Sequence, residues 1–149
     1  EIERVPQFWE WLIHHGNAGN LKMPLEIFEE VSPGRDRAHP FYRWRTNAET
    51  REAVVLQEDP EPDIVQRVLD GGYGLDLTEN ELINIGKDPF LIAAAIAAPD
   101  RVVVTSEVTK RTARRGKARI PDVCDDLGVQ WIDEFRFIRA LDFKTNWQP

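Results

Sequence analysis

The sequence predicts an α/β domain in which helices flank a mostly parallel sheet. Short apolar runs alternate with segments of helical spacing, and this alternation is typical of parallel sheets. The most informative stretch joins a helix over residues 88–97 to a buried strand over residues 102–107. Both ends of the stretch carry an acid, Asp88 and Glu107. Helix starts and strand ends meet at one edge of such a sheet, so we expect the two carboxylates to share a crevice there.

The remaining elements follow from apolar spacing, caps and breakers. Residues 5–13 form an amphipathic helix that ends at Gly16, with Trp9 in the core. The later elements are a short strand at 21–24, a helix from Pro24, a helix at 41–44, a strand at 53–56, a helix at 64–69 closed by Gly71 and Gly72, a helix capped by Thr78 and Glu81, a helix from Pro121 to Gly128, a strand at 129–132 and a helix at 135–141.

Composition limits the class of protein. The chain has 149 residues, of which 42% are hydrophobic and 30% charged, as in one globular domain. It shows no leader peptide and no apolar run long enough to span a bilayer, so we expect a cytoplasmic protein without membrane contact. The single Cys124 is expected to be a reduced core thiol.

The charge distribution bears on nucleic-acid binding. A net charge of −7 argues against binding by bulk electrostatics. One basic run contains no acid, however, and its members are Lys110, Arg111, Arg114, Arg115, Lys117 and Arg119. The run is either a solvated loop or an arm that contacts phosphates or an acidic partner.

Each acid also has a simpler explanation. Asp88 before Pro89 makes a good N-cap and first helical residue, and Glu107 alone would be expected in solvent. A group of acids needs a counter-charge, because two carboxylates about 4 Å apart repel by roughly 4 kcal/mol at an effective dielectric constant near 20. Mg²⁺ or Mn²⁺ would supply it.

Five motifs, taken in order, resemble the PIN-like family of small toxin nucleases. They are Pro6-x-Phe8-Trp9-x-Trp11-Leu12, Pro24-x-x-Ile27-x-x-Glu30-Val31, Asp88-Pro89-Phe90-Leu91-Ile92-Ala93, Val103-Val104-Thr105-Ser106-Glu107 and Ile120-Pro121-Asp122-Val123-Cys124. The resemblance implies a three-layer fold over residues 1–149 as a single domain, with a carboxylate cluster that binds Mg²⁺ or Mn²⁺ for RNA hydrolysis. It assigns catalytic and metal-binding roles to Glu30, Asp88 and Glu107, and a further metal-binding role to Asp122.

The chain departs from the family at its beginning. Members of the family open with a strand that ends in an aspartate, and no such strand precedes the first helix here. The segment was omitted, was removed, or is lacking in a degenerate member of the family. We favour omission or removal, since a sheet without its central strand would leave backbone groups unpaired.

Three functional hypotheses follow. The first is a metal-dependent endoribonuclease that acts as the toxin of a toxin–antitoxin pair, with RNA as substrate and a cognate antitoxin as partner. The second is a non-catalytic PIN-like module that binds a protein or RNA. The third is a structural subunit whose basic residues dock an acidic partner. PIN-like toxins often form homodimers, and the aromatic first helix could serve that purpose, although core packing explains the same residues equally well.

Overall fold

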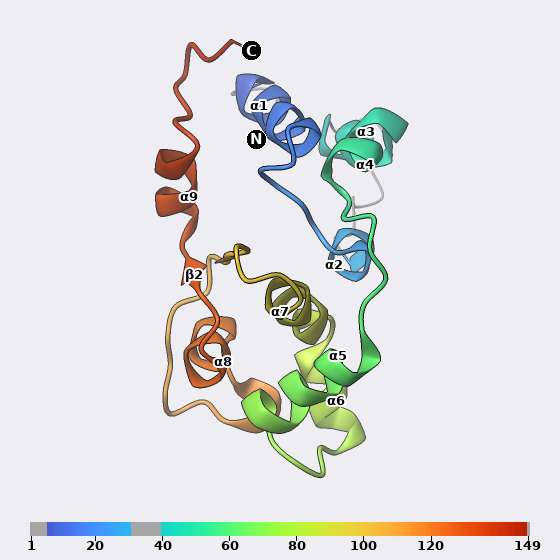
Figure 1. Ribbon diagram of the computed structural model, residues 1–149, viewed down its shortest axis with the longest axis vertical. Helices are drawn as coiled ribbons and strands as arrows, with labels where there is room; N and C mark the ends of the chain where they lie inside the picture. Colours follow the sequence, from blue (N-terminus) through green and yellow to red (C-terminus); the bar gives the residue numbers. More distant parts are fainter. Residues whose placement is uncertain (1–5, 31–39, 149) are drawn as a thin grey trace. The chain divides into compact units, whose positions relative to one another are not determined.

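The computed structural model describes residues 6–30 and 40–148. It divides into two compact units, one formed by residues 1–57 with 141–149 and the other by residues 58–140. Figure 1 shows the elements of both units. Within the described residues, no helix combines the length and apolar character needed to cross a membrane.

The first unit is helical. Its elements are α1 (Pro6–Asn17), α2 (Leu25–Glu30), α3 (Pro40–Thr46) and α4 (Ala48–Val54). Helices α1 and α3 pack against α4, and Phe28 of α2 belongs to a core cluster with Ala53 and Val54.

The second unit contains both strands of the described sheet. Its elements are α5 (Pro62–Val68), the π-helical turn η2 (Leu69–Tyr73), α6 (Glu79–Ile85), α7 (Asp88–Ile96), β1 (Val103–Val104), the 3-10 turn η3 (Arg115–Lys117), α8 (Ile120–Leu127), β2 (Trp131–Ile132) and α9 (Glu134–Ala140). Strands β1 and β2 run parallel, with Val103 opposite Trp131. The expected α/β class is therefore confirmed, with a two-stranded parallel sheet among the described residues.

Helix α7 lies in the core of the second unit. It is apolar along most of its length, with Ile92 fully buried, and it packs against α5, α8 and β1. Burial of this helix fixes the position of its first residue, Asp88, at the surface end of the core.

Several sequence predictions are confirmed in detail. Thr78 and Glu81 form the expected capping box at the start of α6. Helix α8 ends at Gly128, whose φ of 69° is the left-handed conformation that favours glycine at a helix C-terminus. Cys124 is buried, as expected.

Two predictions in the first unit need correction. The strand expected at residues 53–56 begins as helix, because Asn47 caps α4 by accepting the backbone N–H of Glu49 at 2.7 Å and the helix then continues to Val54. Val55 then forms a parallel bridge with Met23, inside the strand expected at 21–24. Gly16 does not end α1. It allows α1 to approach α4, since a Cβ at this position would lie 2.6 Å from the carbonyl oxygen of Ala53.

The tryptophans of α1 also differ from expectation. Trp11 is the fully buried one, with 0% exposure, and its indole N–H donates to the carbonyl of Leu141 at 3.2 Å. Trp9 is half-buried and packs against Trp44. These contacts within the first unit support the explanation of the aromatic residues as core.

Two helix boundaries in the second unit were also misplaced. Gly71 and Gly72 do not close a helix but lie inside the turn η2, where a Cβ on Gly72 would collide with Val123 of α8. Asp88 is the first residue of α7 and not its N-cap, which is Lys87. Asp88 therefore lies one residue beyond the expected N-cap, in the first turn of the helix.

Candidate functional site

Asp88 and Glu107 line one cavity in the second unit, here called the carboxylate cavity. Its volume is about 500 Å³. The residues that line it are Asn84, Ile85, Asp88, Glu107, Lys110, Thr112, Ala113, Gly116, Lys117, Ala118 and Arg119. The start of α7 and the segment after β1 thus contribute the two acids to one hollow, as the sequence pattern predicts.

The orientation of Glu107 is fixed by three hydrogen bonds. Its backbone N–H donates to the Thr105 hydroxyl at 3.2 Å. Arg119 Nη1 donates to Oε1 at 2.8 Å, and the backbone N–H of Ile120 donates to Oε2 at 2.8 Å. A carboxylate offers about four acceptor positions, so both oxygens of Glu107 can accept a further ligand.

The basic run divides into paired and unpaired cations. Arg111, Arg115 and Arg119 each form an ion pair with an acid of the second unit. Among the described residues, the side chains of Lys110, Arg114 and Lys117 form no such pair. The two lysines line the carboxylate cavity, and Arg114 lines the other cavity of this unit. These two lysines are the cations that remain available to an anion at this site.

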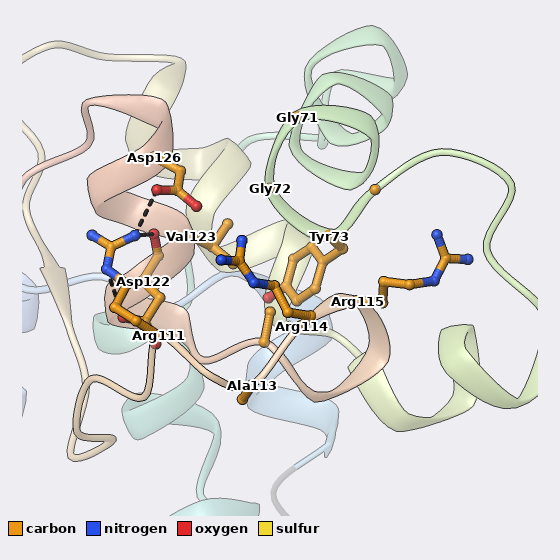
Figure 2. Close-up of a pocket in the computed structure, with 12 residues that line it drawn as sticks. Gly71, Gly72, Tyr73, Arg111, Ala113, Arg114, Arg115, Asp122, Val123 and Asp126 are labelled. Carbon is orange, nitrogen blue, oxygen red and sulfur yellow. Dashed lines mark hydrogen bonds and ion pairs between the residues drawn. The ribbon is translucent and has the colours of Figure 1, made fainter.

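A second, smaller cavity lies beside the turn η2 and is called here the glycine-turn cavity. Its volume is about 220 Å³, and it is lined by Gly71, Gly72, Tyr73, Gly74, Arg111, Ala113, Arg114, Arg115, Ala118, Asp122, Val123 and Asp126. Figure 2 shows Arg114 close to Tyr73 and the Arg115 side chain pointing away from it.

Arg115 anchors the loop that carries the basic run, called here the basic loop. Its Nε lies 2.6 Å from Glu81 Oε1, and its two terminal nitrogens donate to the carbonyls of Leu75 and Asp76. This guanidinium, followed by a backbone hydrogen bond at Thr78, lowers the pKa of Glu81 to about 2. Arg115 therefore attaches the loop to α6.

Asp122 lines the glycine-turn cavity and has partners of its own. It is 4% exposed, and its Oδ2 accepts the backbone N–H of Lys110 at 2.6 Å. Its Oδ1 lies 3.2 Å from Arg111 Nε, and Arg111 also pairs with Asp126 (Figure 2) and with Asp125. These contacts fold the basic loop back onto α8.

Glu30 belongs to the other unit. It is the last residue of α2, where it is exposed, whereas the other three predicted acids belong to the second unit. Within residues 6–30 and 40–148, no group of three or more His, Cys, Asp or Glu side chains is arranged to hold a metal ion. The structure brings together Asp88 and Glu107 among the predicted acids.

Sequence reasoning missed Tyr73 and the role of Arg119. Tyr73 is 2% exposed and lies in the core cluster of the second unit. Its sequence signal is the Gly71–Gly72–Tyr73–Gly74 segment, which resembles an ordinary helix end. Arg119 is the last member of the basic run, and its contact with Glu107 becomes visible only in the fold.

Comparison with known proteins identifies a family but no characterised relative. No curated protein matches the chain, and no solved structure matches it. Residues 1–145 match a family described as a domain of unknown function (DUF4411). Because the match covers nearly the whole sequence, the chain belongs to the DUF4411 family.

Proposed function

We propose that this protein is a metal-dependent endoribonuclease with a three-layer PIN-like fold, and that it acts as the toxin of a toxin–antitoxin pair. The observation that carries the proposal is the carboxylate cavity, where Asp88 and Glu107 lie with Lys110 and Lys117. The two carboxylates complement the positive charge of a divalent cation. The two unpaired lysines complement the negative charge of a phosphodiester bound to that cation.

The donor set fits Mg²⁺ or Mn²⁺. Mg²⁺ keeps several waters and is commonly bound through one or two protein carboxylates together with substrate phosphates. Asp88 and Glu107 supply two carboxylates, and the hydrogen bonds from Arg119 and Ile120 leave both Glu107 oxygens able to accept. A bound ion would polarise the scissile phosphate and lower the pKa of a coordinated water.

The residues of the chain would then act in distinct ways. Asp88 and Glu107 hold the ion, while the lysine ammonium groups attract the RNA backbone into the cavity. Arg119 compensates the charge of Glu107 when no ion is present. The antitoxin, and a role for Glu30 as a further ligand, rest on the resemblance to PIN-like toxins. The same resemblance implies a ligand role for Asp122, whereas its contacts with Lys110 and Arg111 favour a structural role.

Substitution of the two cavity acids tests the proposal. The full chain should cleave a fluorescently labelled single-stranded RNA in Mn²⁺ or Mg²⁺, and EDTA should stop cleavage. Asp88→Asn and Glu107→Gln should each reduce cleavage to background. The urea midpoint should be nearly unchanged in Asp88→Asn and somewhat lower in Glu107→Gln, because a neutral amide weakens the hydrogen bonds from Arg119 and Ile120. Asp100→Asn is the matched control, because Asp100 is an exposed acid of the same unit, and it should cleave like the wild type. Cleavage that survives in Asp88→Asn would refute the proposed site.

A non-catalytic RNA-binding module is the second candidate. It is favoured by the existing partners of Glu107, since Arg119 already neutralises this acid. This candidate predicts RNA binding that is independent of Mn²⁺ and no Mn²⁺ site of millimolar or tighter affinity. Mn²⁺ titration followed by electron paramagnetic resonance (EPR) distinguishes the two.

A further inference from the structure

The hydroxyl of Tyr73 is a buried polar group without a protein partner in the part of the chain that the structure describes. The residue is 2% exposed. Buried polar groups are nearly always hydrogen-bonded to protein or to ordered water. The Tyr73 hydroxyl therefore requires an acceptor that is not a described protein atom.

Tyr73 lies next to the loop that forms one wall of the carboxylate cavity. It is the last residue of η2, which packs against α8 and η3. Figure 2 shows its ring extending from η2 towards the loop that carries Ala113. Ala113 and Ala118 line both the glycine-turn cavity, with Tyr73, and the carboxylate cavity, with Asp88 and Glu107. The phenol and the two acids thus line neighbouring cavities that share the segment from Ala113 to Ala118 as a wall.

Charge favours a donor role for this hydroxyl. Burial raises the pKa of Tyr73, and the negative charges of Asp88 and Glu107 raise it further. The phenol therefore keeps its proton. A neutral O–H within electrostatic reach of two carboxylates is stabilised when its hydrogen points toward them.

We infer that Tyr73 is a positioning residue of the carboxylate cavity, donating a hydrogen bond through one bound water to the Asp88–Glu107 pair. The inference rests on the proposed function, because it assigns to that site an outer group which orients the ligating carboxylates. Outer partners of this kind change metal affinity by about 10–100-fold when they are removed. A tyrosine that served packing alone would leave metal affinity unchanged when replaced by phenylalanine.

The test compares the two tyrosines of the chain. Tyr73→Phe removes the hydroxyl and keeps the ring, and Tyr42→Phe, in α3 of the first unit, is the matched control. Mn²⁺ affinity is measured from the EPR signal of free Mn²⁺, and the urea midpoint is measured alongside. Tyr73→Phe should bind Mn²⁺ about 10-fold more weakly than the wild type, and Tyr42→Phe should bind like the wild type.

A second measurement uses the unmodified side chain. In protein labelled with ¹³C at tyrosine Cζ, Mg²⁺ should shift the Tyr73 resonance, which Tyr42→Phe identifies by eliminating the other signal. The shift should disappear in Asp88→Asn. If Tyr73→Phe binds Mn²⁺ with the affinity of the wild type and Mg²⁺ does not shift the Tyr73 resonance, the inference is overturned while the nuclease proposal stands. Absence of both Mn²⁺ binding and RNA cleavage in the wild type would overturn the proposed function, and the inference with it.

Discussion

We expect Asp122 to stabilise the fold and not to bind the metal ion. Its carboxylate is 4% exposed and accepts the Lys110 backbone N–H at 2.6 Å. A hydrogen bond to a charged group contributes about 1.5–3 kcal/mol. Asp122→Ala removes the acceptor and leaves that N–H without its partner, so the free energy of unfolding should fall by about 2 kcal/mol.

Asp122→Asn provides the graded comparison. The asparagine oxygen can still accept the Lys110 N–H, but a neutral hydrogen bond is roughly half as strong as a charged one. The expected loss is therefore about 1 kcal/mol. In a chain of this size, 1 kcal/mol corresponds to a shift of about 2–4 °C in the melting temperature.

The assay combines stability with metal binding. Urea unfolding followed by far-UV circular dichroism gives the free energies, and EPR titration gives the Mn²⁺ affinity of the same samples. We expect the order wild type, Asp122→Asn, Asp122→Ala in stability, with unchanged Mn²⁺ affinity in both variants and with Asp100→Asn as the exposed control. Wild-type stability combined with lost Mn²⁺ binding would refute this reasoning and make Asp122 a ligand.

Three further predictions concern the two units. The Arg115 guanidinium, followed by a backbone hydrogen bond, lowers the pKa of Glu81 from 4.5 to about 2, so its stabilisation is present above pH 4.5 and is lost as the pH falls toward 2. The urea midpoints of the wild type and Glu81→Gln should differ at pH 6 and converge near pH 2, and equal midpoints at pH 6 would contradict the contact. Gly16→Ala places a Cβ 2.6 Å from the Ala53 carbonyl oxygen and should destabilise the chain by about 1–3 kcal/mol in urea unfolding; an unchanged midpoint would show that the helices can separate freely. Burial raises the pKa of Cys124 to about 12, so an aromatic disulfide reagent at pH 8 should react with it only in denaturant, and rapid reaction of the folded chain would show an accessible thiol.

Local signals in the sequence predicted the elements that depend on local physics. The capping box at Thr78 and the glycine after α8 specify their helix ends through neighbouring backbone groups. The apolar run of α7 and the parallel strand pair follow from hydrophobic spacing. The meeting of Asp88 and Glu107 in one cavity followed from their places at a helix start and after a strand.

Features that depend on contacts between distant residues were not predictable in this way. Gly16 and Gly72 resemble helix terminators in the sequence. In the fold, another helix lies so close to each of them that a side chain would not fit. The division of the basic run depends on acids distant in sequence, such as Glu81 for Arg115. The glycines around Tyr73 indicate only a helix end, because burial without a hydrogen-bond partner is a property of the fold alone.

The central claim is that Asp88 and Glu107 hold the same divalent cation. A double-mutant cycle on Mn²⁺ affinity tests it most directly, using Asp88→Asn, Glu107→Gln and the double variant in the EPR titration. Ligands of one ion are strongly coupled, so the double variant should bind Mn²⁺ no more weakly than the weaker single variant. Losses that simply add, or single variants that bind Mn²⁺ like the wild type, would contradict a shared site.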